Sequence, residues 1–483
     1  MKMDNGVALP TAEKNRSAGN CITGEIPVFK VSGVFSSHMV LQRDNKIKIW
    51  GFADKDGIKV TGTFDGDTAY TEVKNNRFEL VFPKRGASSS PLCMEISDER
   101  GNTVSFDDIL VGDVWLIGGQ SNAELNLAPC LTATPVDDFD ESADFRLFMQ
   151  TQCYPFTHQE FCGCPQPEVI NPEWRWKRPD KEASLTFSAV GWFFAEEVSR
   201  KLGVPIGVIN VSAGGACIRE LVPEELAAEM GYDFGANVRQ GGYYNSLINP
   251  FVGLPFSGMI FFQGESEGIW KDQAERYDKE LSMLVSDERR RFGFDFPFFN
   301  IQLSDYRGEG LQYFPYLDIV RMKQFDALKL IKNSYLTVAM DLGSPKDHPD
   351  FAHSPLKKAL TARVSSLVLA AYYGIGDPSD AGSPVPVSAV TESGIVTVKF
   401  KNVSGGLKSR SGTAEVAGFT FGEYGSLTPA KAVITGADTV AVYVPENTEA
   451  KQLNYAFSVV ITEENAQLIK DGGLPCPAFS LKL

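Results

Sequence analysis

The stretch DILVGDVWLIGGQSNAELNL (residues 108–127) decides the fold class of this chain. Its central VWLI is a continuous apolar run, which is typical of a parallel strand buried on both faces. The run ends at Gly118 and Gly119, which permit a sharp turn, and NAELNL then reads as the start of a helix. Ligands of open α/β folds bind at the carboxyl ends of the strands, so the turn carries Ser121 to the edge where a site is expected. Backbone N–H groups at a helix start can also stabilise an oxyanion, although a serine here is equally typical of a simple N-cap.

Four further apolar runs predict buried strands: IGVINV (206–211), GMIFFQG (258–264), FPFFNIQ (296–302) and YLTVAM (335–340). Helical patterns lie between them, and over residues 270–285 apolar side chains recur every three or four positions. A last helix is predicted over residues 356–374, where a glycine ends it. This alternation predicts an α/β domain over residues 109–378, with a parallel sheet flanked by helices.

All-β domains are predicted on both sides of the α/β domain. Residues 28–108 contain short β-rich segments, at 46–51, 59–64, 77–82 and 93–98, which predict a β-sandwich. After a linker rich in Pro, Gly and Ser (377–388), more β-rich segments predict a C-terminal β domain over 379–483. Residues 1–27 form a tail without a signal-peptide pattern, which predicts a cytoplasmic protein, although an extracellular protein given without its leader would show the same sequence.

The composition excludes several partners. The chain of 483 residues has 46 basic and 61 acidic side chains, a net charge of −15, whereas nucleic-acid binding and docking on anionic membranes need basic surfaces. Eight cysteines are too few for a disulfide scaffold. The pair Cys162 and Cys164, with Cys153 and His158 nearby, lacks the second ligand pair that structural zinc usually has. We therefore expect no metal, no nucleic acid and no membrane partner; the sequence does not indicate an oligomeric state.

A mechanism that uses an imidazole must choose among four histidines: His38, His158, His348 and His353. The last two both follow the strand YLTVAM, and His353 stands three residues after Asp350. An Asp-x-x-His turn lets the carboxylate fix the tautomer of the ring and stabilise the imidazolium. Together with Ser121 this supplies a nucleophile, a base and an orienting carboxylate.

Two other strand ends carry polar or glycine-rich turns, Gly214-Gly215 and Gln263-Gly264-Glu265-Ser266. The glycine pair by itself is typical of a strand-end turn. A carboxamide and a carboxylate at a strand end are costly to bury unless they are hydrogen-bonded or used. Because three strands end in such turns, we expect the turns to converge on one edge of the sheet.

In this order on one α/β unit, GQSN, GG, QGES and D-x-x-H resemble the sequence blocks of the SGNH hydrolases. More narrowly, they are similar to the sialate O-acetylesterase group and its carbohydrate acetylesterase relatives. Flanking segments also fit, among them SSHMVLQRDNKIKIWGFAD near the start and GLPCPAFSLKL at the end, so the resemblance covers residues 28–483. It implies an SGNH-hydrolase-type α/β fold with N-terminal and C-terminal all-β domains.

The resemblance also implies roles for particular residues. Ser121 would be the nucleophile, His353 the general base and Asp350 its orienter. The oxyanion hole would consist of the N–H of Ser121, a glycine N–H at Gly214 or Gly215, and the side chain of Gln263. Glu265 would orient Gln263 or contact the sugar, and Asn122 would support the site or contact substrate.

The chain departs from the family pattern near the histidine. Relatives usually read like D-I-H-P, whereas this chain has the longer DHPDFAHSP, which leaves Asp347 with His348 as a second candidate pair. His353 is preferred because SPLKKALTARV follows it as the family's helix follows its histidine, while Asp347 stays a rival carboxylate. Ala123 also replaces the methionine often found after GQSN.

The implied activity is that of a serine esterase that removes O-acetyl groups from a carbohydrate through an acetyl-serine intermediate, without a cofactor. O-acetylated sialic acid is the expected substrate. Two alternatives stay open: an acetylxylan or other glycan acetylesterase that uses the same site, and a glycan-binding protein without catalysis.

Overall fold

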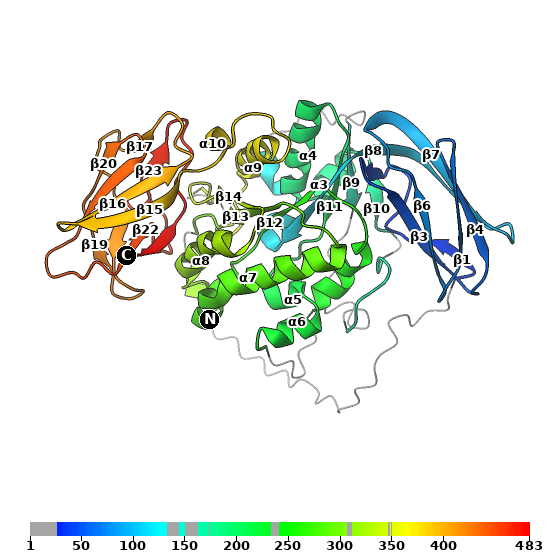
Figure 1. Ribbon diagram of the computed structural model, residues 1–483, viewed down its shortest axis with the longest axis horizontal. Helices are drawn as coiled ribbons and strands as arrows, with labels where there is room; N and C mark the ends of the chain where they lie inside the picture. Colours follow the sequence, from blue (N-terminus) through cyan, green and yellow to red (C-terminus); the bar gives the residue numbers. More distant parts are fainter. Residues whose placement is uncertain are drawn as a thin grey trace.

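The computed structural model describes residues 27–132, 144–149, 163–171, 173–232, 241–306, 312–345, 348 and 350–483. Three parts lie side by side along the long axis of the molecule (Figure 1). The N-terminal β-sheets stand at one end, the C-terminal β-sheets at the other, and the α/β part lies between them. None of the described helices is both long and apolar enough to cross a membrane.

The N-terminal part consists of two sheets that pack face to face. One sheet contains β1 (Phe29–Val31), β3 (Ile47–Ala53) and β6 (Arg77–Phe82). The other contains β4 (Lys59–Phe64), β5 (Asp67–Glu72), β7 (Ser88–Asp98) and the first half of β8 (Thr103–Gly119), with β2 (Val40–Gln42) paired to β8. Residues of β6 are alternately exposed and buried, as the period of a half-buried strand requires. The strands predicted here from the sequence are all present.

Strand β8 belongs to two structural parts at once. Its first half pairs antiparallel with β7, and residues 113–119 pair parallel with β11 (Ile206–Asn210) and β12 (Gly258–Phe262) of the α/β part. The domain boundary expected at residue 108 therefore falls inside one continuous strand. The hydrophobic core is likewise continuous from Phe78 of the N-terminal sheets to Trp115 of the central sheet.

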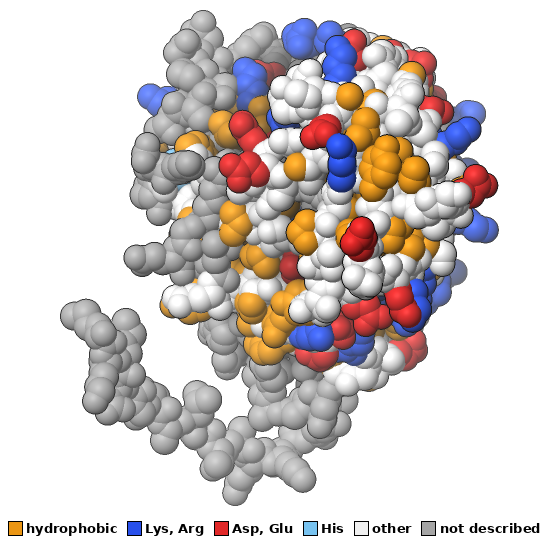
Figure 2. All heavy atoms as spheres, turned by 90° about the vertical axis from the view of Figure 1, so that its left-hand side faces the viewer, with side chains coloured by type: hydrophobic (Ala, Val, Ile, Leu, Met, Phe, Trp, Pro, Cys, Tyr) orange, Lys and Arg blue, Asp and Glu red, His pale blue; other side chains and the backbone are white. Residues whose placement is uncertain are grey.

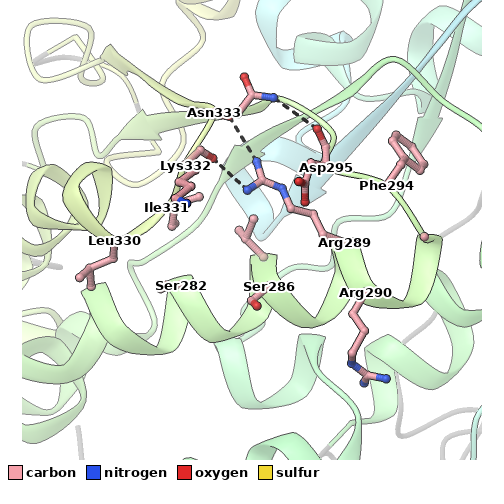
Figure 3. Close-up of a pocket in the computed structure, with 12 residues that line it drawn as sticks. Ser282, Ser286, Arg289, Arg290, Phe294, Asp295, Leu330, Ile331, Lys332 and Asn333 are labelled. Carbon is pink, nitrogen blue, oxygen red and sulfur yellow. Dashed lines mark hydrogen bonds between the residues drawn. The ribbon is translucent and has the colours of Figure 1, made fainter.

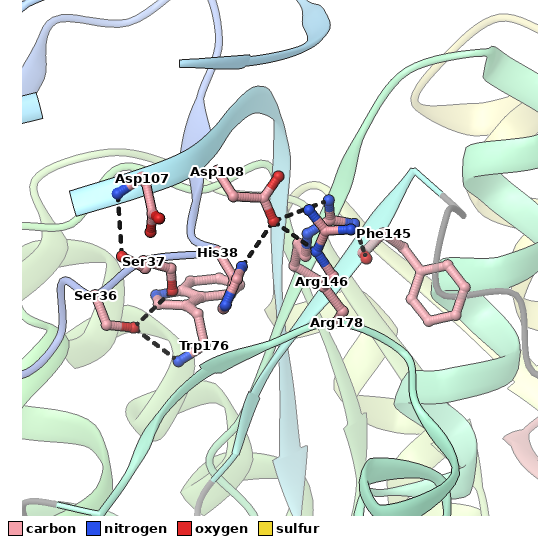
Figure 4. A network of polar contacts seen from close by, with 9 residues as sticks. All are labelled: Ser36, Ser37, His38, Asp107, Asp108, Phe145, Arg146, Trp176 and Arg178. Atoms are coloured by element: carbon pink, nitrogen blue, oxygen red, sulfur yellow. Dashed lines mark hydrogen bonds and ion pairs between the residues drawn. The ribbon is translucent and has the colours of Figure 1, made fainter. Parts of the chain in front are cut away.

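A charged cluster lies where β8 passes from one part to the other (Figure 4). Asp108, whose φ is 51°, accepts hydrogen bonds on Oδ2 from Arg178 Nε at 2.8 Å and pairs with His38 Nδ1 at 2.7 Å. The guanidinium of Arg146 lies 3.5 Å from the same oxygen. Burial opposes ionisation of this carboxyl, but the hydrogen bonds and the two guanidinium charges hold the pKa of Asp108 below its usual value. The cluster thus fastens the N-terminal sheets to β9 and β10.

The central sheet has the strand order β10-β9-β11-β8-β12-β13-β14. All neighbouring pairs are parallel except β10 with β9. The added strands are β9 (Phe145–Met149), β10 (Arg175–Lys177), β11 (Ile206–Asn210), β12 (Gly258–Phe262), β13 (Phe298–Gln302) and β14 (Ser334–Val338). Every residue of β11, β12 and β13 is buried, which confirms the prediction of strands covered on both faces. The short β9 and β10 were not predicted from the sequence.

Helices cover both faces of this sheet, with α4 and α9 on one side and α7 and α8 on the other (Figure 1). The α-helices are α1 (Ser121–Glu124), α3 (Lys181–Thr186), α4 (Ala189–Leu202), α5 (Ile218–Leu221), α6 (Glu224–Glu229), α7 (Lys271–Phe292), α8 (Leu317–Leu330), α9 (Lys357–Ala371) and α10 (Pro378–Ala381). Short 3₁₀ segments span Ala128–Thr132, Asn249–Phe251 and Glu267–Ile269, and a π-helical turn spans Tyr244–Ile248.

Local sequence explains where the long helices begin and end. Ser188 caps α4 by accepting a hydrogen bond from the N–H of Gly191 at 3.1 Å. Gly203 ends the helix with a left-handed φ of 63°. The helix predicted over residues 270–285 continues to Phe292 and ends at Gly293, with φ 84° and three arginines in its last turn.

The C-terminal part contains three small sheets. The first has the order β15-β16-β21-β20, the second β19-β18-β22-β24, and the third pairs β17 with β23. Their bounds are β15 (Val385–Glu392), β16 (Ile395–Lys401), β17 (Leu407–Ser409), β18 (Phe419–Phe421), β19 (Thr428–Pro429), β20 (Ala432–Gly436), β21 (Thr439–Tyr443), β22 (Gln452–Tyr455), β23 (Leu468–Lys470) and β24 (Phe479–Lys482). The segment 377–388, expected to be a linker, instead contains α10 and the start of β15.

Figure 2 shows the end of the molecule seen from the C-terminal side, where hydrophobic side chains are scattered among charged ones. In the C-terminal part, Val387 and Val390 of β15 and Tyr443 of β21 are exposed hydrophobic side chains. Scattered exposure of this kind is normal for a protein surface.

The C-terminal part is anchored to the α/β part by a second hydrophobic core and by buried polar contacts. Met322 and Phe325 of α8 pack in the same core as Phe479 of β24. The fully buried Arg321 of α8 donates to the backbone oxygens of Leu303, Ser304, Ser458 and Val459, at distances of 2.6–3.1 Å. One guanidinium therefore ties the loop after β13 to the C-terminal part.

We expect the substitution Arg321→Met to lower the free energy of unfolding by about 3 kcal/mol, because buried carbonyl oxygens lose their donors. Chemical denaturation of the purified protein measures this loss. The control is Lys323→Met on the same helix, where a partly exposed Nζ pairs with Asp278 at 3.4 Å. That variant should lose less than about 1 kcal/mol, and equal losses for both would contradict the anchoring role.

Candidate active site

The turn after β8 presents Ser121 at the carboxyl edge of the sheet. Gly119 has a φ of 129°, and a Cβ at this position would lie 2.1 Å from the backbone oxygen of Phe262 on β12. Only glycine permits this close approach. Ser121 follows as the first residue of α1 and is half-buried. Its hydroxyl has no hydrogen-bond partner within the described part of the chain, so it is available to a ligand.

The turn after β11 lies directly beside Ser121. Ala213 donates to the oxygen of Gly119 at 3.1 Å, which fastens this turn to the end of β8. A Cβ on Gly214 would lie 3.8 Å from the Cβ of Ser121, and Gly215 has a φ of 72°. Neither glycine N–H, nor that of Ser121, donates to an acceptor among the residues that the structure describes. These three N–H groups are therefore free to bind a developing oxyanion.

The turn after β12 is joined to the Ser121 turn by Gln120. The Oε1 of Gln120 accepts hydrogen bonds from the N–H of Gly264 at 3.2 Å and of Ser266 at 3.3 Å. It also accepts one from Nε2 of Gln263 at 3.2 Å. The prediction that these strand ends converge is thus confirmed by direct contacts.

The side chain of Gln263, which was expected to donate to the oxyanion, faces internal partners in the structure. This side chain is completely buried, and its Nε2 faces three acceptors: Gln120 Oε1, the oxygen of Ala216 at 3.0 Å, and the carboxylate of Glu267. Both amide hydrogens are committed to these internal partners. Gln263 therefore braces the turn in this structure, and its role in the oxyanion hole stays a prediction.

Glu267, which the sequence analysis did not single out, orients Gln263 in place of Glu265. Its Oε1 also accepts from the N–H of Ile218, the first residue of α5, at 2.6 Å. Burial raises the pKa of Glu267 to about 7, although its hydrogen bonds favour the ionised form. The carboxylate thus connects the turn after β12 with the segment after Gly214 and Gly215.

Asn122 and Glu265 form a buried pair beneath the site. Asn122 Nδ2 donates to Glu265 Oε1 at 2.6 Å and to the backbone oxygen of Ala352 at 3.0 Å. Asn122 is completely buried and Glu265 is 1% exposed. In this structure Glu265 contacts Asn122 instead of Gln263, and the roles expected for it stay predictions. Burial is the main cause that raises its pKa above the usual value.

His353 and Asp350 form the local pair that the Asp-x-x-His pattern predicts. His353 Nδ1 lies 2.8 Å from Asp350 Oδ2, and Asp350 Oδ1 accepts from the N–H groups of Ala352 and His353 at 2.9 and 3.0 Å. Burial works against the ionised carboxyl, but these hydrogen bonds and the charge of His353 lower the pKa of Asp350. The ring is therefore held in place with Nε2 directed away from the carboxylate.

The other histidines have different surroundings. The Nδ1 of His348 contacts the backbone of Asp350, at 2.9 Å from the oxygen and 3.2 Å from the nitrogen, instead of a carboxylate. His38 belongs to the charged cluster around Asp108, where β8 passes from the N-terminal part to the α/β part. His158 and Asp347 lie outside the described residues, as do Cys153 and Cys162.

One hydrogen bond relates the serine to the histidine. The residue after Ser121, Asn122, donates to the residue before His353, Ala352. Ser121 and His353 therefore flank a 3.0 Å contact between two turns. A serine, an imidazole oriented by a carboxylate, and free N–H groups beside the serine are the components needed for acyl transfer.

Comparisons with known proteins agree with this arrangement. Residues 169–365 match the family described as carbohydrate esterase, sialic acid-specific acetylesterase. The sialate O-acetylesterase of Homo sapiens is 25% identical over 371 residues, which cover 69% of each chain. That of Mus musculus is 25% identical over 419 residues, which cover 74% of each chain. These matches support placing the chain among the sialate O-acetylesterase-like proteins.

A solved structure that is similar to this chain extends the comparison to the whole fold. It is XAC1771, a carbohydrate acetylesterase from Xanthomonas citri, with 26% identity and a TM-score of 0.79. The match covers 94% of this chain and 100% of that one, the flanking β-sheets included. The chain is a carboxylic ester hydrolase, as its family relatives are.

Several residues that shape the site were not predicted from the sequence. These residues are Gln120, Glu267 and Lys357. Each contacts a residue that is distant in the sequence and that only the fold brings close. Gln120 lies inside the quoted GQSN block, and Glu267 lies two positions after Glu265, so their polar character in buried segments was the available signal. Within the described residues, no group of three or more His, Cys, Asp and Glu side chains is placed to hold a metal ion.

A separate cavity of about 670 Å³ lies at the edge of the central sheet opposite to the edge that carries Ser121 (Figure 3). Residues that precede β13 and β14 line it, together with the C-terminal turns of α7. Arg289 projects into it but donates to the backbone oxygens of Phe296, Lys332 and Asn333. The guanidinium is thus used to close the strand ends, and the cavity lies far along the sheet from Ser121.

Proposed function

We propose that this chain is a serine esterase of the SGNH type that hydrolyses acetyl esters on carbohydrate hydroxyls. The observation that carries the proposal is the Asp350–His353 pair, held at 2.8 Å in a loop that is hydrogen-bonded to the turn of Ser121. The family match supports the same reaction class.

The reaction proceeds in two halves in this proposal. Ser121 Oγ attacks the acetyl carbonyl while His353 Nε2 accepts the hydroxyl proton, and Asp350 stabilises the imidazolium through Nδ1. The carbonyl oxygen becomes an oxyanion bound by the N–H groups of Ser121 and of Gly214 or Gly215. Collapse breaks the ester bond, and His353 gives its proton to the departing sugar oxygen.

Water then replaces the sugar. His353 removes a proton from the water, whose oxygen attacks the acetyl-serine carbonyl. Acetate leaves, and the proton returns to Ser121 Oγ. All acid, base and electrophilic groups in this scheme are parts of the chain, so it includes no cofactor.

O-acetylated sialic acid is the proposed substrate. The support is the similarity to two proteins named sialate O-acetylesterase, over 69% and 74% of the chain. The net charge of −15 does not attract an anionic sugar from a distance, so recognition in this proposal is local to the site.

Acetate release measured side by side on three substrates tests the proposal: O-acetylated sialic acid, acetylated xylan and a small chromogenic acetate. We expect release from all acetyl esters small enough to reach Ser121, with the highest kcat/KM for the sialic acid. A higher kcat/KM for xylan would reassign the substrate to a plant glycan. Release from none would reject the esterase and favour a glycan-binding protein.

A further inference from the structure

We propose that Lys357 is a positioning residue of this site, whose ammonium group holds the side chain of Asn122 and thereby sets the Ser121 turn against the His353 loop. The inference rests on the proposed function, because it assigns a role in the arrangement of that same serine and histidine. Lys357 is the first residue of α9 and lies four positions after His353.

The contacts of Asn122 form a chain between three segments. Lys357 Nζ donates to Asn122 Oδ1 at 2.6 Å, and Nζ lies 5.3 Å from the centre of the Phe262 ring. On its other side, Asn122 Nδ2 donates to Glu265 and to the oxygen of Ala352. Every polar atom of the Asn122 amide therefore has a partner. Its oxygen must face the ammonium group and its nitrogen must face the two acceptors, so only one orientation of the amide is possible.

The position of Lys357 is unfavourable for an ordinary structural lysine. It is 2% exposed, although lysines are almost never fully buried unless they are paired. It also stands in the first turn of a helix, where the macrodipole disfavours a positive charge. Contacts specific to this site must therefore offset both costs. The hydrogen bond to Asn122 and the contact with the Phe262 ring are two such contacts.

The ammonium group of Lys357 lies among acidic groups from several segments. Glu265, from the turn after β12, is the buried carboxylate on the other side of Asn122. Asp350 in the loop before α9 and the Cys130 thiol in the segment after α1 interact electrostatically with Lys357. His353 interacts in the same way with Glu265. Burial lowers the pKa of Lys357 to about 8, while the acidic neighbours partly oppose this. Loss of the proton removes a positive charge that favours the ionised form of the buried Glu265.

The test compares Lys357→Met with Lys358→Met. Met has nearly the shape of the lysine stem without its charge, and Lys358 is an exposed neighbour on the same helix that serves as a matched control. With the chromogenic acetate, we expect Lys357→Met to lower kcat by about 100-fold, because small errors in the position of reacting groups cost that much. KM should change less than about threefold, and Lys358→Met should behave as the wild type.

The pH profile separates positioning from simple stabilisation. The wild-type kcat should decline above pH 8, where Lys357 loses its proton, after correction for spontaneous ester hydrolysis. Lys357→Arg keeps its charge and should restore part of kcat and move the decline to higher pH. A merely structural lysine would change the melting temperature without changing this profile.

Three outcomes would overturn the inference. They are a wild-type kcat that stays constant to pH 10, a Lys357→Met variant with normal kcat, or a variant that changes KM alone. The first needs only the wild-type protein, so it decides even where both variants fail to fold. An inactive wild type with every ester would instead reject the proposed function, so the two failures are distinguishable.

Discussion

Replacing Ser121 by Ala is expected to reduce acetate release by about 10⁴-fold or more, because the variant lacks the oxygen that forms the covalent intermediate. The remaining oxyanion N–H groups and substrate binding should leave only a small residual rate. The fold should be unchanged, since the Ser121 hydroxyl makes no hydrogen bond within the described part of the chain. Acetate release and thermal unfolding measure the two effects.

Ser282→Ala is the matched control for that substitution. Ser282 is half-buried like Ser121, but it lies in α7 and lines the cavity at the opposite edge of the sheet. It should retain full activity. A covalent serine-directed phosphonate provides a second readout, because it should label the wild type and Ser282→Ala but not Ser121→Ala. Normal acetate release from Ser121→Ala would show that another group is the nucleophile.

Replacing His353 by Ala should have an effect of the same order, about 10⁴-fold on kcat, because the variant has no base to activate the serine. The structure favours His353 over His348 for a specific reason. The Nδ1 of His353 meets the Asp350 carboxylate at 2.8 Å, whereas that of His348 meets only backbone atoms. Steady-state kinetics on the chromogenic acetate measures the loss.

His348→Ala is the control and should keep kcat within about threefold of the wild type. Asp350→Asn should resemble His353→Ala more than His348→Ala, since it removes the carboxylate that fixes the tautomer. The opposite pattern, with His348→Ala inactive and His353→Ala active, would move the base to His348 and its carboxylate to Asp347.

Parts of this site could be predicted from the sequence because they depend on neighbours in the chain. The Asp350–His353 contact joins residues three positions apart, so a single turn of backbone produces it wherever the loop lies. Gly119 belongs to the same class, because the end of a buried strand and a sharp turn are both visible in VWLIGG. The run of buried strands was equally visible, as the burial of β11, β12 and β13 confirms.

Other parts depended on which strands become neighbours. Asn122 meets Glu265 across 143 positions and Lys357 across 235, so their pairing requires the order of the central sheet. The internal contacts of Gln263 could not be predicted from the sequence for the same reason. A polar side chain at a strand end can point to the ligand or inward, and Glu267 and Gln120 supply inward acceptors that only the fold assembles.

The α/β class, the serine turn and the local acid–histidine pair could be predicted from residues close together in the chain, because hydrophobic period and short-range turns are properties of consecutive residues. The unbroken course of β8 through the expected boundary and the place of Lys357 beneath the serine turn depend on the folded arrangement of distant segments. Such contacts are made when distant segments are brought together, and burial then decides which polar groups must pair.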